Sequence, residues 1–182
     1  MTFKKTVTLK DGRNCLLRNG VTSDGKAVLD VFNRTHEETD YLLTYSDENC
    51  FTDSQEADFL QRKTDSTNTV EIIAIVDGVV AGTAGIDALG MRDKIKHRAV
   101  FGIAITKEFW GLGIGKSLME ACIECAREAG YLQLELEVVA ENERAVEMYK
   151  RAGFIEYGRN PKAFRLRTGE YQELIDMRLE LK

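Results

Sequence analysis

The glycine-rich segment at residues 110–115, Trp-Gly-Leu-Gly-Ile-Gly, has the composition of a phosphate-binding loop. It follows an apolar run over residues 100–105 that is typical of a buried strand, and it precedes an amphipathic segment. A helix that begins directly after a glycine loop offers free backbone N–H groups and the positive end of its dipole to an anion. Small residues also let the backbone approach a pyrophosphate closely. The sequence therefore predicts a phosphate site here.

Two other kinds of glycine loop match this segment poorly. Gly115-Lys116-Ser117 has the end of a P-loop, but Trp110 stands where the first glycine is required and Gly111 is one residue too close. A dinucleotide loop needs G-x-G-x-x-G in a first βαβ unit, whereas this one is G-x-G-x-G and lies late in the chain. A glycine turn that only begins a helix is the remaining structural alternative.

A second segment, Asn142-Glu-Arg-Ala-Val-Glu-Met-Tyr149, follows after roughly thirty residues and predicts a helix that ends at Gly153. In this order and spacing, the two segments resemble the GNAT superfamily of acetyl-CoA-dependent N-acetyltransferases. The resemblance is specific over about residues 98–155 and rests only on the order of elements outside that range. It implies acetyl-CoA as co-substrate and no metal.

The loop matches the family pattern at Ile105, Gly113 and Gly115. Trp110 departs from it, because the family has Gln or Arg at that position. The family loop acts mainly through backbone N–H groups, so the departure leaves the anion site in place. The cofactor contacts that the resemblance implies are at Ile103, Ile105, Trp110, Gly111, Leu112, Gly113, Ile114, Gly115, Lys116, Asn142 and Tyr149.

Glu137 is the first candidate for a catalytic base. A primary amine with a pKa near 10 is protonated at neutral pH, so an enzyme that acetylates it needs a base or a water molecule that leads to one. Glu137 lies on a predicted strand, and family members that acetylate protein N-termini have a similar Leu-Glu-Val stretch whose Glu is the base. Glu135 on the same face and Asp87 at the end of an earlier strand are alternatives, as are two carboxylates that are simply solvated.

Tyr149 is the candidate general acid. It stands seven residues after Asn142 and matches the family tyrosine that points at the cofactor sulfur. A desolvated phenol can give its proton to a departing thiolate. The structural alternatives are a core aromatic for Tyr149 and a helix cap for Asn142.

The acceptor pocket is weakly encoded. In the family fold it forms from the first two helices, their connection and the last hairpin, so the candidates are acidic and aromatic residues of that connection: Asp40, Tyr41, Tyr45, Glu48 and Phe51. We expect direct transfer of an acetyl group to an amine of a small molecule or a protein N-terminus. A non-catalytic CoA-binding module with the same fold is the main alternative, and an ATP-binding domain is a second.

Composition narrows the setting. The 182 residues are 43% hydrophobic with a net charge of −5, which is typical of a globular protein and argues against a nucleic-acid surface. No apolar stretch predicts a membrane span and no secretion signal is evident, so we expect a cytoplasmic protein. Cys122 and Cys125 fall on the apolar stripe of a predicted helix, which favours core packing over a redox or metal role.

The pattern predicts one α/β domain over residues 1–182, similar to the GNAT fold, with a mixed, mostly antiparallel sheet flanked by helices. The C-terminal strand alternates strictly, and we expect that it could pair across a homodimer interface. The predicted elements are strands near 6–19 broken at Asp11-Gly12, a helix from Ser23 or Asp24 to 38, a helix capped at 52 or 53, a hairpin 69–86 with its turn at Asp77-Gly78, a strand 97–105, a helix 113–130, a strand 132–139, a helix 142–153 and a hairpin around Thr168-Gly169.

Overall fold

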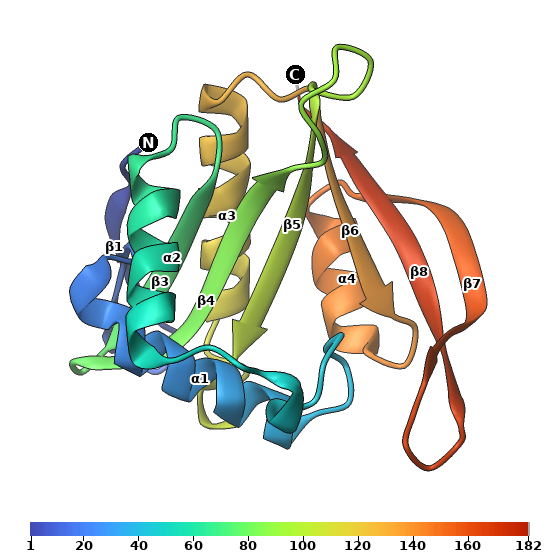
Figure 1. The fold of residues 1–182 in the computed structure, drawn as a ribbon, viewed down its shortest axis with the longest axis horizontal. Coiled ribbons are helices and arrows are strands. Elements are labelled where there is room, and N and C mark those ends of the chain that lie inside the picture. Colours follow the sequence, from blue (N-terminus) through green and yellow to red (C-terminus); the bar gives the residue numbers. More distant parts are fainter. Residues whose placement is uncertain (182) are drawn as a thin grey trace.

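The strand segments of the chain form one eight-stranded sheet in the computed structural model, which describes residues 1–181 (Figure 1). The strands are β1 (Lys4–Thr8), β2 (Asn14–Asn19), β3 (Val70–Val76), β4 (Val79–Ala88), β5 (Arg98–Ile105), β6 (Gln133–Val139), β7 (Ile155–Arg165) and β8 (Tyr171–Glu180). Their order across the sheet is β1-β2-β3-β4-β5-β6-β8-β7, and only the β5–β6 pair is parallel. This confirms the predicted fold class.

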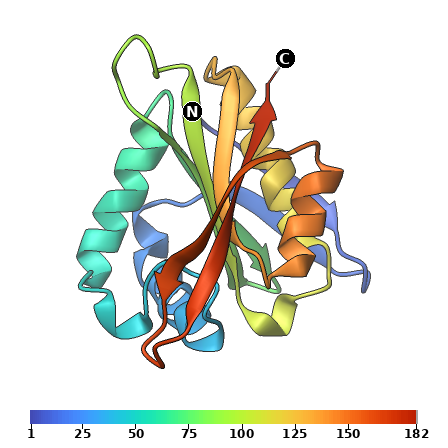
Figure 2. The ribbon, with the colours of Figure 1, turned by 90° about the vertical axis from the view of Figure 1, so that its right-hand side faces the viewer.

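Four helices cover the two faces of the sheet. They are α1 (Gly25–Glu38), α2 (Asp53–Asp65), α3 (Ile114–Glu128) and α4 (Glu143–Arg151), with short 3₁₀ turns at Thr22–Asp24, Ser46–Glu48 and Lys107–Phe109. Figure 2 shows α1 and α2 on one side of the sheet and α3 and α4 on the other. The face that carries α1 and α2 is bare over β6, β8 and β7 (Figure 1).

The predicted turns and caps form as their residues require. Asp77 and Gly78 both have positive φ, 51° and 81°, as a tight two-residue hairpin turn demands. Thr52 and Gln55 form the predicted capping box at the start of α2, with the Gln55 N–H donating to the Thr52 hydroxyl. Gly130, with φ 80°, follows the last residues of α3 as a left-handed glycine.

The main core lies between the sheet and α3. Cys122 and Cys125 are both buried in this core as free thiols, so the predicted packing role is confirmed. Ile175, Met177 and Leu179 of β8 also point inward, as their alternation predicted. None of the helices in residues 1–181 has the length and apolar character needed to cross a bilayer.

The sheet splits between β5 and β6. These two strands pair only at Arg98↔Gln133, Ala99↔Leu134 and Val100↔Glu135. Beyond that rung, β5 stays paired with β4 to Ile105, and β6 stays paired with β8 to Val139. Because each strand keeps its outer partner, the two diverge and leave a V-shaped gap with unpaired backbone edges.

One expectation about the C-terminal strand is wrong. β8 lies between β6 and β7 and hydrogen-bonds both of them, so it has no free edge for pairing across a dimer interface. The long tail hairpin folds back so that its first strand, β7, becomes the edge of the sheet.

Candidate active site

The glycine loop forms the start of α3 at the wide end of the gap. Gly111 and Gly113 have φ of 88° and 99°, which only glycine adopts without strain. Gly113 is the N-cap, and the Ser117 N–H donates to the Gly113 carbonyl in the first hydrogen bond of the helix. The N–H groups of residues 114–116 therefore precede the helical ladder and are free to bind an anion.

Trp110, which stands where the family has Gln or Arg, ties this loop to β5 through its side chain. Its indole Nε1 donates to the Ile105 carbonyl at 2.6 Å, which ties the loop back to the end of β5. Two cations lie over its ring, with Lys107 at 5.7 Å and Arg144 at 6.0 Å from the ring centroid. Sequence reasoning missed Arg144, because nothing in the sequence shows that this α4 residue returns to the loop.

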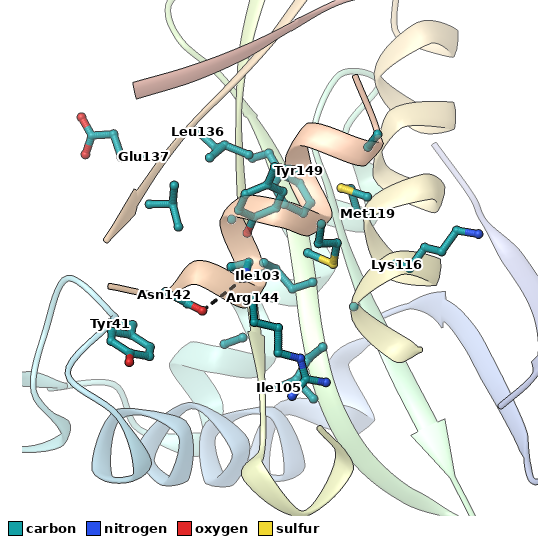
Figure 3. A pocket seen from close by; sticks show the side chains of 18 of the residues that line it. Tyr41, Ile103, Ile105, Lys116, Met119, Leu136, Glu137, Asn142, Arg144 and Tyr149 are labelled. Carbon is teal, nitrogen blue, oxygen red and sulfur yellow. Dashed lines mark hydrogen bonds between the residues drawn. The ribbon is translucent and has the colours of Figure 1, made fainter. Parts of the chain in front are cut away.

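A cavity of about 1220 Å³ occupies the gap and continues over the bare face of the sheet. Figure 3 shows Lys116 and Arg144 at the α3 side of it and Glu137 and Tyr41 at the opposite side. Ten of the eleven expected cofactor residues line it: Ile103, Ile105, Trp110, Gly111, Gly113, Ile114, Gly115, Lys116, Asn142 and Tyr149.

Leu112 does not lie on this lining, contrary to expectation. Its side chain packs against the main core, and its carbonyl accepts a hydrogen bond from the Lys10 N–H at 3.1 Å. The Leu112 side chain is therefore turned inward and anchors the loop to the core.

The edge of β5 presents backbone groups to the gap at alternate residues. The Thr106 N–H donates to Ala81, and the Leu89 N–H donates to the Arg98 carbonyl. These bonds fix the phase of the antiparallel ladder with β4, so the backbone groups of Ile103 point the other way, toward the gap. An extended polar ligand in the gap would find hydrogen-bonding groups there.

Tyr149 extends from α4 into the cavity (Figure 3). Its side chain is buried, with ring contacts to Phe101 at 6.2 Å and Phe154 at 5.7 Å between centroids. Burial raises the pKa of the Tyr149 phenol, so it is a neutral proton donor at physiological pH. Within residues 1–181 no hydrogen bond occupies its hydroxyl, which is left for a ligand.

Asn142 caps its helix and also lines the cavity. Its side-chain oxygen accepts the Ala145 N–H at 3.3 Å and caps α4. The same side chain lines the cavity, so its amide NH₂ can still donate to a ligand.

The three candidate bases differ in their partners. Glu135 is buried and receives two hydrogen bonds from Arg98, at 2.5 and 2.7 Å, so the expectation that it is solvated is wrong. Asp87 is paired with Lys63. Glu137 is exposed to the cavity and has no ion-pair partner in the described part of the chain. A carboxylate without a cation partner takes a proton most readily, because no ion pair is lost.

Glu137 and Tyr149 lie on opposite sides of β6. Leu136 points toward Tyr149, and the next residue, Glu137, points to the other face of the strand (Figure 3). The gap between β5 and β6 opens one rung away, after Glu135. A group held in the gap would therefore have a proton donor on one side and a proton acceptor on the other.

A model of the acetyltransferase (GNAT) family matches residues 28–154, which include every one of these features. The chain belongs to this family. This decides against the P-loop and dinucleotide alternatives, and it confirms the predicted enzyme class, an N-acetyltransferase that uses acetyl-CoA as co-substrate. Among residues 1–181, no group of three or more His, Cys, Asp or Glu side chains is arranged to hold a metal ion.

Similar proteins support the assignment. The chain is 33% identical to the L-amino acid N-acetyltransferase AaaT of Escherichia coli K12 over 64% of its own length and 72% of the relative. It resembles the crystal structure of a GNAT acetyltransferase from Streptococcus pneumoniae, with a TM-score of 0.87, 28% identity and coverage of 91% and 99% of the two chains. A phosphinothricin acetyltransferase from Sinorhizobium meliloti in complex with acetyl-CoA shares the fold, with a TM-score of 0.80, 18% identity and coverage of 96% and 89%.

The acceptor end of this acetyltransferase differs from the sequence expectation. Of the five expected residues, Tyr41 lines the cavity, whereas Asp40, Tyr45, Glu48 and Phe51 do not. Tyr45 instead stacks under Arg167 at 4.1 Å from its ring centroid, in the turn between β7 and β8. The lining residues that sequence reasoning missed are Leu42, Leu43, Leu89, Val100, Tyr157, Phe164 and Leu174.

Proposed function

We propose that this acetyltransferase moves an acetyl group directly from acetyl-CoA to a primary amine, with Glu137 as base and Tyr149 as acid. The observation that carries the proposal is the placement of these two side chains on opposite sides of β6, beside the gap where β5 and β6 diverge. Direct transfer needs a donor and an acceptor that meet from two sides, and the gap joins two such spaces.

The donor side of the site would hold the cofactor through backbone groups. The free N–H groups at the start of α3 suit the pyrophosphate, and Lys116 and Arg144 add charge nearby. The unpaired edge of β5 at Ile103 suits the amide groups of the pantetheine arm. This arrangement brings the thioester to the point where Tyr149 reaches into the cavity.

The reaction then follows from the two protonation states. The ammonium acceptor gives a proton to the Glu137 carboxylate, directly or through water, and the free amine attacks the thioester carbonyl carbon. As the C–N bond forms, the C–S bond breaks, and the Tyr149 hydroxyl gives its proton to the departing thiolate. The new amide nitrogen loses its extra proton to water, and the Tyr149 tyrosinate takes up a proton from water. Backbone N–H groups at the edge of β5 are the available donors for the carbonyl oxygen.

The cysteines support transfer without an acyl-enzyme. Burial raises the pKa of the Cys125 thiol to about 12 and that of Cys122 well above its ordinary value, so neither is a nucleophile near neutral pH. Cys15 is buried as well, and the exposed Cys50 lies off the cavity lining.

The acceptor would be an amine of a small molecule or a peptide N-terminus. The negative carboxylates on the bare face of the sheet favour an ammonium group, and the E. coli relative carries the name of an amino-acid N-acetyltransferase. Four free cysteines fit a reducing cytoplasm. If a homodimer forms, the edge strands β1 and β7 are available for it, and light scattering would measure the mass.

Thiol release from acetyl-CoA in the presence of a panel of amines tests the proposal. We expect turnover that depends on the amine and produces its N-acetyl derivative. The rival, a CoA-binding module without activity, predicts binding of acetyl-CoA in calorimetry and no thiol release with any amine.

A further inference from the structure

The acceptor end of the cavity has apolar walls drawn from distant segments. Leu42 and Leu43, in the loop between α1 and α2, line this end, and Leu43 is 79% exposed. Tyr157 and Phe164 of β7 and Leu174 of β8 complete the wall. Large apolar side chains that gather in the open at one cavity mark a surface that binds an apolar group.

Two carboxylates without cation partners lie side by side on this face of the sheet, and one of them, Glu137, lines the cavity. Glu137 of β6 and Asp176 of β8 are direct cross-strand partners, so their side chains share a face. Neither has an ion-pair partner within residues 1–181. Like charges directly opposite each other destabilise a sheet, so the two carboxylates repel each other. A bound cation would reduce this repulsion.

The cations of the cavity lie at its other end. Those on the lining are Lys10, Lys116, Arg144 and Arg151, which come from the β1–β2 turn, α3 and α4. The cations nearest to the acceptor end are already engaged: Arg98 with Glu135, Arg167 with Asp47, and Arg178 with Glu180 and the ring of Tyr157. An acceptor that carried its own carboxylate would find no free cation among the described lining residues at this end.

We infer that the acceptor is a monoamine with an uncharged, apolar body and no carboxylate beside the amine. The inference rests on the proposed function and narrows it. The ammonium group would lie at Glu137, next to the charge of Asp176, and the apolar body would lie against Leu43 and Phe164. A free amino acid would bring a carboxylate next to two others, and a polyamine would place further charges against apolar walls.

Decarboxylated pairs of substrates test this directly. L-Phenylalanine and 2-phenylethylamine differ only in the carboxylate, as do L-leucine and 3-methylbutylamine, and spermidine serves as the polycation. We expect kcat/KM to be at least about tenfold higher for each monoamine than for its amino acid, and higher than for spermidine. The amine of the amino acid has the lower pKa, so ease of deprotonation cannot produce this preference.

A conservative variant tests whether the Asp176 carboxylate contributes to the preference for monoamines. Asp176→Asn keeps the size of the side chain and removes one carboxylate, so the ratio of kcat/KM between monoamine and amino acid should fall by about threefold or more. Glu173→Gln is the matched control, because Glu173 lies on the same strand with its side chain on the opposite face. It should leave the ratio unchanged.

The outcomes separate the inference from the proposed function. Amino acids that equal or exceed their decarboxylated partners, or spermidine as the best acceptor, would overturn the inference while leaving the acetyltransferase mechanism intact. A ratio that Asp176→Asn does not change would also overturn it. Absence of thiol release with every amine, despite binding of acetyl-CoA, would instead remove the proposed function and the inference with it.

Discussion

The two ends of the cavity are formed by different kinds of groups. The donor end consists of backbone: two left-handed glycines, the first turn of α3 and the unpaired edge of β5, all within residues 101–116. The acceptor end consists of side chains from the α1–α2 loop, the β4–β5 loop and the tail hairpin. A site made of backbone groups can bind acetyl-CoA whatever side chains surround it. A site made of side chains can instead differ between enzymes that take different acceptors.

The two ends also carry opposite charges. Lys116 and Arg144 line the donor end, and Glu137 lines the acceptor end with Asp176 as its cross-strand neighbour. A phosphate is attracted to the first end and an ammonium group to the second, so each substrate is steered to its own side. In the proposed mechanism the acetyl group is transferred between the two ends, where Tyr149 and Glu137 flank β6. Variants that affect one end only would sharpen this division.

Glu137→Gln should have the largest effect. We expect kcat near neutral pH to fall about 100-fold or more, with the Kd for acetyl-CoA unchanged, because the base belongs to the acceptor end. The loss should shrink as the pH rises toward the amine pKa near 10, since a free amine needs no base. Steady-state rates over pH 6–10 and calorimetry would measure both.

Glu135→Gln and Asp87→Asn are the comparison variants for the base. Both break an ion pair, with Arg98 and with Lys63, so they should affect thermal stability more than chemistry. A wild-type to Glu137→Gln rate ratio that does not vary with pH, together with a pH-dependent ratio for Glu135→Gln, would move the role to Glu135.

Tyr149→Phe should have the next largest effect. It keeps the ring contacts with Phe101 and Phe154 and removes only the hydroxyl, so kcat should fall about 10- to 100-fold with little change in melting temperature. Tyr131→Phe is the matched control, because Tyr131 is equally buried but donates to the Asn68 carbonyl. That variant should lose stability and keep its kcat. The reverse pattern would make Tyr149 a core aromatic.

The difference between the ends also decides what the sequence could predict. The order of elements, the 77–78 turn, the Thr52 cap and the glycine loop were all predictable, because each depends on residues close together in the chain. The acceptor walls were not, because Leu43, Phe164 and Leu174 come from distant segments and line one cavity only after the sheet has formed. An apolar residue in a loop carries no local sign of a pocket.

Contacts between residues far apart in the sequence explain the remaining misses in the candidate site. The alternation of β6 placed Glu135 and Glu137 on the same face, which is correct, but it gave no information about Arg98 across the strand pair. Residues that lie 37 positions apart thus determine which carboxylate is free. Arg144 was missed for the same reason: its contact with Trp110 joins α4 to a loop that precedes α3.

Gly113→Val should act only at the donor end, with an expected rise of about tenfold in the Kd for acetyl-CoA. Gly113 has φ 99°, and no atom lies within 4 Å of the position that a Cβ would take, so the side chain would meet the bound phosphate and distort the loop without clashing with the protein. Gly169→Val is the control, because it has φ 94° and open space in the β7–β8 turn. Both should lose similar stability, and only Gly113→Val should weaken binding; equal Kd values in the two folded variants would contradict a phosphate site at the loop.

The smallest effect is expected at a strap between two acceptor-end loops. Arg167 in the β7–β8 turn makes two hydrogen bonds to Asp47, at 2.7 and 2.9 Å, and its backbone N–H donates to the Tyr45 hydroxyl at 3.1 Å. Water screens an exposed pair of this kind, so we expect its effect on the acceptor KM to be no more than about threefold. Asp47→Ala should raise the acceptor KM by that amount and leave the Kd for acetyl-CoA unchanged, because the strap touches only the acceptor loops.

Arg167→Ala should do slightly more, since it also removes the stacking on Tyr45. The double variant should be no worse than Arg167→Ala alone, because both changes break the same link. Added salt should reduce the difference between wild type and Asp47→Ala, since an exposed ion pair is screened. An Asp47→Ala variant that weakens acetyl-CoA binding would show that the two ends are coupled through the loops, and the division between them would then fail.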